Sequence, residues 1–161
     1  MRIGKTDLLF DCGRAVLMRG AAVGMMARDL TALFVTHMHS DHTTDYNDII
    51  TTRWISNVAP RPLLAYGPVG FKRFTDATLA MLDTDVHYRM AHHADLQHAP
   101  QVEVHEISEG LVDDAGGVRV IAAATGMERA LAKAQKSPPG QAIMSVKRRM
   151  LERASPAWLA A

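Results

Sequence analysis

Four metal-ligating side chains within six residues are the feature that most constrains this chain. His37, His39, Asp41 and His42 directly follow residues 32–35, an apolar segment typical of a buried strand. Alternate residues of an extended segment point the same way, so His37 and His39 can reach one metal ion together. Asp41 and His42 lie where the chain turns toward the next helix, and they can face a second ion. Imidazole and carboxylate are ligands that Zn²⁺ accepts, so a two-metal hydrolytic site is predicted.

The remaining pattern predicts an α/β layered fold, because apolar runs bounded by turn residues alternate with helical patterns. Strands are expected at residues 8–10, 32–35, 63–66, 102–107 and 118–122, and helices at residues 14–23, 43–56 and 71–82. Residues 87–99 are expected to be irregular, and residues 113–117 to form a turn. A chain of 161 residues is long enough for one domain with a hydrophobic core.

The composition changes near residue 126. Residues 127–161 hold seven Lys/Arg and only two Asp/Glu, and the strand pattern is lost there. The sequence therefore predicts a folded domain over residues 1–125 and a basic, Ala-rich tail over residues 126–161.

Charge and cysteine content restrict the class of protein. The formal net charge of +1 gives no whole-chain attraction to nucleic acid. Cys12 is the single cysteine and cannot form an internal disulfide, which fits a reducing compartment. No N-terminal signal and no apolar run long enough to span a membrane is visible in the sequence. A soluble cytoplasmic protein is expected.

Three segments together resemble the ribonuclease Z branch of the metallo-β-lactamase superfamily. They are Phe-Asp-Cys-Gly at residues 10–13, Thr-His-Met-His-Ser-Asp-His at residues 36–42 and Tyr-Gly-Pro-Val-Gly at residues 66–70. Residues 48–54 and 88–96 are similar to actinobacterial members of that branch. The resemblance covers about residues 5–125. It implies a metallo-β-lactamase-type αββα sandwich, of which this chain holds about the N-terminal half.

The resemblance also implies roles for single residues. His37 and His39 match ligands of a first zinc ion, and Asp41 and His42 match ligands of a second. Asp41 also matches the catalytic proton acceptor of ribonuclease Z. Members of this branch cut the 3′ trailer from precursor tRNA, and many hydrolyse small phosphodiesters. They are commonly homodimers, so a homodimer is expected. No membrane attachment is expected.

The chain departs from the family after residue 125. A further ligand histidine is expected there, but the sequence is Thr125-Gly126-Met127, and no histidine follows His105. A frameshifted or truncated reading frame is therefore predicted, with metal sites short of ligands. Two alternatives to a ribonuclease Z-type phosphodiesterase stay open. One is an arylsulfatase-like or other ester hydrolase of the same fold, and the other is an inactive remnant or partner-binding subunit.

Several further residues allow two interpretations. Asp11 either orients a ligand histidine or only shapes its turn. Residues 67–70 either approach a substrate phosphate or form an ordinary strand-to-helix turn. His92 and His93 are either additional ligands or solvated loop residues, and the second interpretation is favoured. Cys12 is interpreted as a small buried residue rather than a nucleophile.

Overall fold

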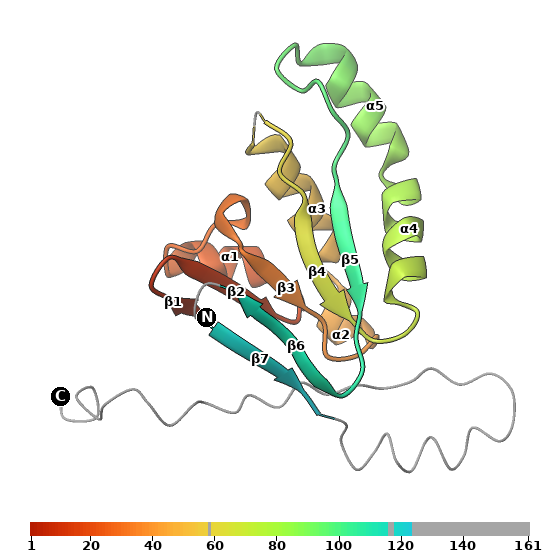
Figure 1. Cartoon of the computed structure of the whole chain (residues 1–161). Coiled ribbons are helices and arrows are strands. Elements are labelled where there is room, and N and C mark those ends of the chain that lie inside the picture. The colour runs from red at the N-terminus through yellow and green to blue at the C-terminus, as the bar shows by residue number, and fades with distance from the viewer. Residues whose placement is uncertain (58, 116–117, 124–161) are drawn as a thin grey trace, which may run out of the picture.

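The computed structural model describes residues 1–57, 59–115 and 118–123. Its main sheet has the order β1-β2-β3-β4-β5, with β1 antiparallel to β2 and the others parallel (Figure 1). The strands are β1 (Arg2–Ile3), β2 (Thr6–Phe10), β3 (Ala32–Phe34), β4 (Leu63–Gly67) and β5 (Val102–Glu106). Because β2 to β5 are parallel, their carboxyl ends meet at one edge of the sheet.

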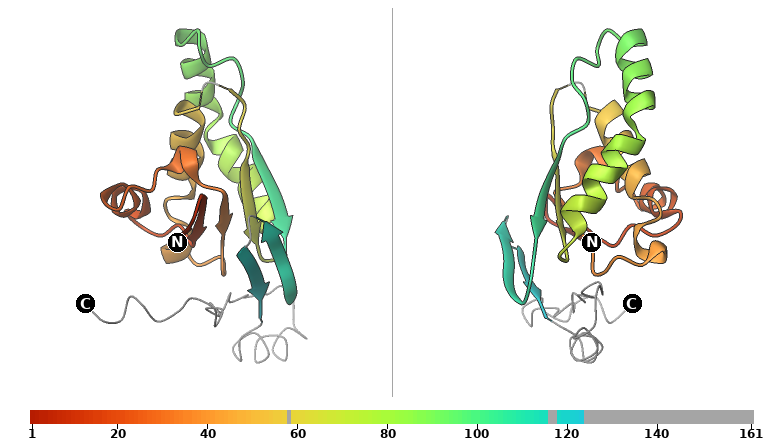
Figure 2. Two further views of the ribbon diagram at one scale, coloured as in Figure 1. Left: turned by 60° about the vertical axis from the view of Figure 1, so that its left-hand side comes forward. Right: turned by 90° about the vertical axis from the view of Figure 1, so that its right-hand side faces the viewer.

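The helices cover one face of this sheet (Figure 2). They are α1 (Val16–Ala22), α2 (Ser40–Thr43), α3 (Tyr46–Ile55), α4 (Phe71–Met81) and α5 (Asp83–His92), with a short 3₁₀ turn, η1 (Ala27–Asp29). Leu33 and Val35 pack with Ile49, Ile50 and Phe71 in the core between helices and sheet. These side chains remove a large apolar area from water and so fix α3 and α4 against β3 and β4.

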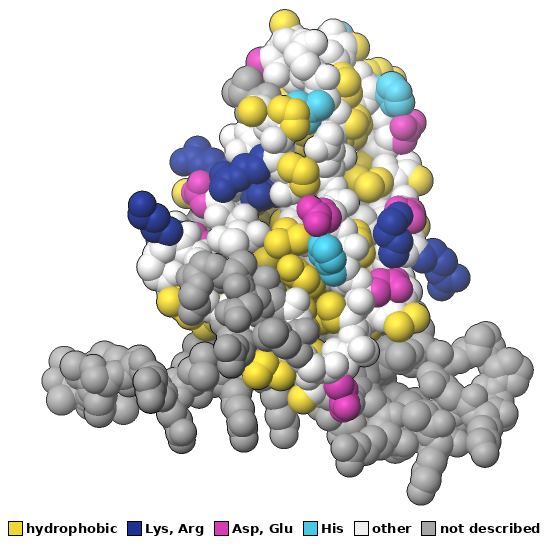
Figure 3. All heavy atoms as spheres, viewed as in Figure 1, with side chains coloured by type: hydrophobic (Ala, Val, Ile, Leu, Met, Phe, Trp, Pro, Cys, Tyr) yellow, Lys and Arg dark blue, Asp and Glu magenta, His cyan; other side chains and the backbone are white. Residues whose placement is uncertain are grey.

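The opposite face of the sheet carries a row of rings and a hairpin. Phe10, Phe34, Tyr66 and His105 stack across four strands, with successive centroids 5.2, 4.7 and 5.0 Å apart. The hairpin pairs β6 (Gly110–Ala115) antiparallel with β7 (Val118–Ala122) and lies in front of β2 and β3 (Figure 1). Hydrophobic side chains also lie over β4 on this face (Figure 3). The hairpin is thus the beginning of a second layer.

Most predicted elements are confirmed, and two predictions are wrong. Residues 83–92 form α5, although residues 87–99 were expected to be irregular. Residues 113–115 belong to β6 and not to a turn, and residues 116–117 of that predicted turn lie outside the described residues. The helix expected over residues 43–56 is present as α3, which begins at Tyr46, and the separate short helix α2 precedes it.

The physical reason for α5 is charge rather than apolar periodicity. Asp83 and Asp85 lie in the first turn of α5, and Arg89 and His92 lie in its last turn. Charges of these signs at these two ends interact favourably with the helix dipole. Arg89 Nε also donates to Asp85 Oδ2 at 2.9 Å, one turn away.

The tail predicted for residues 126–161 lies outside the described residues. Within the described ranges, none of the helices has the length and apolar character to cross a membrane.

Candidate metal centre

The histidine loop, residues 36–45 between β3 and α3, lies at the carboxyl edge of the sheet. Val35 N donates to Tyr66 O at 2.7 Å, which extends the pairing of β3 with β4 by one residue. His39 has extended backbone angles and precedes α2, so the chain turns only after His39.

The structure brings the four predicted side chains together. His37 Nε2 lies 3.1 Å from His39 Nδ1, and the His37 and His42 rings lie 3.9 Å apart at their centroids. Asp41 Oδ2 lies 3.6 Å from His42 Nε2, and the Asp41 side chain is 79% exposed. Two nitrogen ligands of a tetrahedral zinc ion are roughly 3.3 Å apart, given Zn–N distances near 2.0–2.1 Å. The His37–His39 pair therefore has the spacing that one ion requires.

Asp11 fixes the orientation of His42. Asp11 Oδ2 accepts a hydrogen bond from His42 Nδ1 at 2.8 Å, and Asp11 Oδ1 accepts one from Thr36 N at 2.8 Å. Because an ionised carboxylate only accepts, His42 Nδ1 is the donor of this hydrogen bond, and in the neutral ring the lone pair then lies on Nε2. Asp11 also has a φ of 60°, an unusual backbone conformation for a residue with a side chain. The structure thus supports the orienting interpretation of Asp11.

Thr36 fixes the orientation of His37 in the same way. The Thr36 hydroxyl donates its single hydrogen to the Asp11 carboxylate, whose two oxygens lie 2.9 and 3.0 Å away. His37 Nδ1, 3.0 Å from Thr36 Oγ1, must then be the donor to that hydroxyl oxygen. His37 Nε2 is left with its lone pair facing His39. Burial, followed by the neighbouring His42 and His39, lowers the pKa of His37, which favours the neutral, ligating form.

The backbone around Cys12 holds the loop against β2. Cys12 N donates to His42 O at 2.7 Å, and Asp45 N donates to Cys12 O at 2.9 Å. A Cβ on Gly13 would lie 2.1 Å from Asp41 O, so this close approach requires glycine. Cys12 is completely buried, and burial raises the pKa of its thiol, so it is a packing residue and not a nucleophile.

The described residues fit part of a two-metal site. Over residues 1–57, 59–115 and 118–123, no three His, Cys, Asp or Glu side chains are grouped so that they could hold one ion. His92 and His93 do not supply the missing ligand, since α5 ends at the opposite end of the sheet from α2 (Figure 1). Residues 67–70 form a strand-to-helix turn, and Gly70 N donates to Glu106 Oε1 at 2.8 Å. No sequence pattern predicts a role for Glu106.

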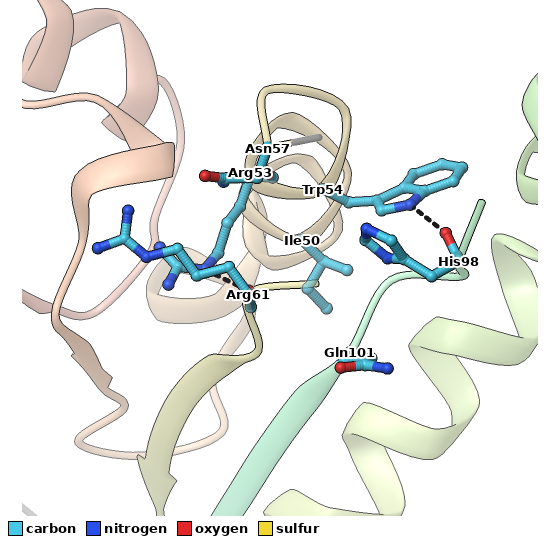
Figure 4. A pocket seen from close by; sticks show the side chains of 7 residues that line it. All are labelled: Ile50, Arg53, Trp54, Asn57, Arg61, His98 and Gln101. Atoms are coloured by element: carbon cyan, nitrogen blue, oxygen red, sulfur yellow. Dashed lines mark hydrogen bonds between the residues drawn. The ribbon is translucent and has the colours of Figure 1, made fainter. Parts of the chain in front are cut away.

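A small cavity lies at the amino ends of β4 and β5, away from the histidine loop (Figure 4). Trp54 Nε1 donates to His98 O there at 2.6 Å. The Arg53 guanidinium points out of the cavity and donates to backbone carbonyls of Ala27 and Leu30 at 2.9 Å. The lining is completed by Ile50, Asn57, Arg61 and Gln101. Its contacts join η1, α3 and the β4 and β5 approaches, which is a structural role.

Similarity to known proteins covers residues 1–127 of the chain. Residues 1–127 match the model of the Metallo-beta-lactamase superfamily. Ribonuclease Z of Mycobacterium marinum is 46% identical over 127 residues, which are 78% of this chain and 46% of that protein. Ribonuclease Z of Mycobacterium bovis is 45% identical over 127 residues, covering 78% and 45%. The chain spans less than half the length of these relatives.

Two solved structures share the fold. The short form of human tRNase Z superposes with a TM-score of 0.50 at 24% identity, covering 66% of this chain and 35% of that protein. The metallo-beta-lactamase fold protein YhfI of Bacillus subtilis superposes with a TM-score of 0.54 at 19% identity, covering 77% and 42%. At these identities the likeness is one of fold.

Proposed function

Because this chain belongs to the metallo-beta-lactamase superfamily, we propose that it is a metal-dependent phosphodiester hydrolase of the ribonuclease Z type. The predicted family resemblance and fold class are confirmed over the N-terminal portion of that fold. The observation that supports the function most is the His37–His39 nitrogen pair at 3.1 Å, with His42 and Asp41 beside it.

The four side chains have separate roles. His37 and His39 would hold one zinc ion, and Asp41 and His42 would contribute to a second. Bound zinc supplies a polarised phosphoryl oxygen and a water of lowered pKa. The Asp41 carboxylate, which is the most solvent-exposed partner of His42, accepts a proton during hydrolysis. Asp11 and Thr36 accept hydrogen bonds from Nδ1 of His42 and His37, so Nε2 is the ligating nitrogen of each neutral ring.

The substrate class follows from the relatives. We propose precursor tRNA, or a small phosphodiester, as the substrate, because the most similar relatives are ribonuclease Z proteins. A cytoplasmic homodimer belongs to the same proposal. A homodimer would also allow a second copy to contribute to a site that one copy leaves short of ligands.

One observation favours a second candidate, a chain without metal-dependent turnover. Among the residues that the structure describes, three ligands for a single ion are not grouped together. With two protein ligands an ion is held much more weakly than in a closed four-coordinate site. Such a chain would be an inactive remnant or a partner-binding subunit.

The test is zinc content together with hydrolysis of bis(p-nitrophenyl) phosphate by the full chain. We expect bound zinc and turnover, and Asp41→Asn is expected to lower kcat by about 10²–10⁴-fold, since it removes the proton acceptor. The matched control is Asp95→Asn, at an exposed position in the turn that follows α5. A wild-type chain without zinc and without turnover would support the second candidate. Faster turnover of an aryl sulfate than of the phosphodiester would indicate an arylsulfatase-like enzyme instead.

A further inference from the structure

Glu106 replaces a missing cap at the start of α4. The first amides of a helix have no partners within the helix, and Gly70 has no side chain that could cap them. Glu106, the last residue of β5, supplies the acceptor from another strand. Its Oε1 accepts from Gly70 N at 2.8 Å and from Lys72 N at 2.9 Å. A carboxylate at this end of a helix is also favoured by the helix dipole.

The first two turns of α4 in turn hold Tyr46, the first residue of α3. The Tyr46 ring lies 5.3 Å from Phe71 and 5.6 Å from Phe74, measured between centroids. The Tyr46 hydroxyl and Thr75 Oγ1 are 2.9 Å apart, and both residues are 1% exposed. A buried polar pair inside an apolar contact fixes the relative position of two helices. Because Thr75 Oγ1 also donates to Phe71 O at 3.0 Å, moving the helices apart would leave the buried Tyr46 hydroxyl without its partner.

Tyr46 directly follows the histidine loop. Its neighbour Asp45 donates its amide to Cys12 O at 2.9 Å, and Cys12 N donates to His42 O at 2.7 Å. Asp45 Oδ2 also accepts from Val16 N at 3.2 Å, which ties the same position to α1. The far end of the loop is thus attached on one side to β2 and on the other, through Tyr46, to α4.

We propose that Glu106 is a positioning residue for the histidine loop, acting through α4 and Tyr46. This inference rests on the proposed function, because it gives Glu106 a role only if the loop binds metal and substrate. Glu106 touches none of the four candidate ligands. It fixes the start of α4, and α4 fixes the residue at which the loop ends.

Amide hydrogen exchange on the full chain tests the inference without metal or substrate. In Glu106→Ala we expect exchange at Gly70 and Lys72 to rise about tenfold, as expected for one lost hydrogen bond. Exchange at Asp45 and Cys12 should rise at least about threefold, while exchange at Thr31, whose amide binds Asp7 O at the other edge of the sheet, stays unchanged. A general loss of stability would raise exchange at all five amides together.

Two further variants complete the design. Glu106→Gln keeps an oxygen acceptor and is expected to restore wild-type exchange. Glu103 lies on the same strand, and Glu103→Ala removes only its pair with His105, so exchange at all five amides should stay unchanged. Faster exchange in Glu106→Ala at Gly70 and Lys72 alone, or at all five amides alike, would overturn the inference.

Kinetics separate this inference from the proposed function. If the wild-type chain hydrolyses bis(p-nitrophenyl) phosphate, Glu106→Ala should lower kcat several-fold with little change in KM, and Glu106→Gln should recover it. An unchanged kcat in Glu106→Ala would contradict the inference. If the wild-type chain has no turnover, the proposed function fails, and the exchange pattern at Asp45 and Cys12 still decides the role of Glu106.

Discussion

Asp11 links the two ligand histidines to the strand before them. Its carboxylate accepts from His42 Nδ1 and from the Thr36 hydroxyl, and that hydroxyl orients His37. Removing the Asp11 carboxylate frees the His37 and His42 rings to rotate and to change tautomer. We expect Asp11→Ala to weaken zinc binding about 10–100-fold, the usual effect of losing a partner behind a metal ligand.

The measurement is calorimetric titration of the full chain with zinc alone. Asp11→Asn keeps one acceptor oxygen and should lie between Asp11→Ala and the wild type. Asp95→Ala is the control for loss of an exposed carboxylate. Equal zinc affinity in Asp11→Ala and the wild type would show that Asp11 only shapes its turn.

The contrast between Asp11 and the four ligands shows what the sequence can reveal at this scale. His37, His39, Asp41 and His42 lie on one short segment, so local geometry alone predicts that they converge. Asp11 reaches Thr36 only because β2 and β3 pair in parallel, with Phe10 opposite Phe34. That register depends on the whole sheet, so the sequence left Asp11 with two interpretations. Glu106 was missed for the same reason.

Among the elements, the connection between α3 and η1 depends on one buried arginine. Arg53 is 4% exposed, and its guanidinium donates to the carbonyls of Ala27, Arg28, Leu30, Arg61 and Pro62. Burial lowers the pKa of Arg53 to about 10, so it remains charged at neutral pH. Arg53→Met would remove this donor from all five carbonyls, of which Arg28 O keeps Arg61 Nη1 and Ala27 O keeps Leu30 N. The substitution should reduce the free energy of unfolding by about 3 kcal/mol.

Urea unfolding of the full chain measures this loss. Arg73→Met, at an exposed position of α4, is the matched control and should change the free energy of unfolding by less than about 0.5 kcal/mol. A loss equally small in Arg53→Met would mean that water replaces the guanidinium at no cost.

The hairpin of β1 and β2 gives the fold an acid-sensitive contact. Arg2 donates to both oxygens of Asp7, at 2.7 and 2.6 Å, and the Asp7 side chain is 5% exposed. The hydrogen bonds from Arg2 lower the pKa of Asp7 below its ordinary value of 3.8. A carboxyl group with a lowered pKa in the folded state stabilises that state above its unfolded pKa and loses this effect as the pH falls through its folded pKa.

The resulting prediction concerns Asp7→Asn. The wild type should exceed this variant in free energy of unfolding at pH 7, and the difference should shrink as the pH falls below about 4. Urea unfolding at a series of pH values checks it. Asp48→Asn, an exposed position on α3, should show no such trend. A difference between wild type and Asp7→Asn that stays constant down to pH 2.5 (roughly one unit below the ordinary pKa) would contradict the assignment.

The elements that the sequence missed share a physical reason. Only Val86 of α5 is buried, so no apolar periodicity predicts that helix, and charged pairs stabilise it instead. β6 carries Asp113 and Asp114 beside two glycines, a composition that favours a turn. By contrast, the central strands β3 and β4 consist of apolar residues buried on both faces, and their runs were recognisable.

At the scale of the whole molecule, the two layers meet where the hairpin packs on the sheet. Val118 and Val120 of β7 join Leu8, Phe34 and Tyr66 in one apolar cluster. Alternate residues of a strand face opposite sides, and Val120 is 5% exposed whereas its neighbour Ile121 is 45% exposed. The hairpin therefore protects the apolar face behind the histidine loop.

This neighbouring pair allows a matched test of the second layer. Val120→Asp places a carboxylate among apolar side chains and should lower the free energy of unfolding by about 3 kcal/mol or more. Ile121→Asp adds the same charge to the same strand on its exposed side and should cost less than about 0.5 kcal/mol. Both are measured by urea unfolding of the full chain. Equal effects would mean that the hairpin does not pack on the sheet, and the apolar face over β2 and β3 would then need another cover.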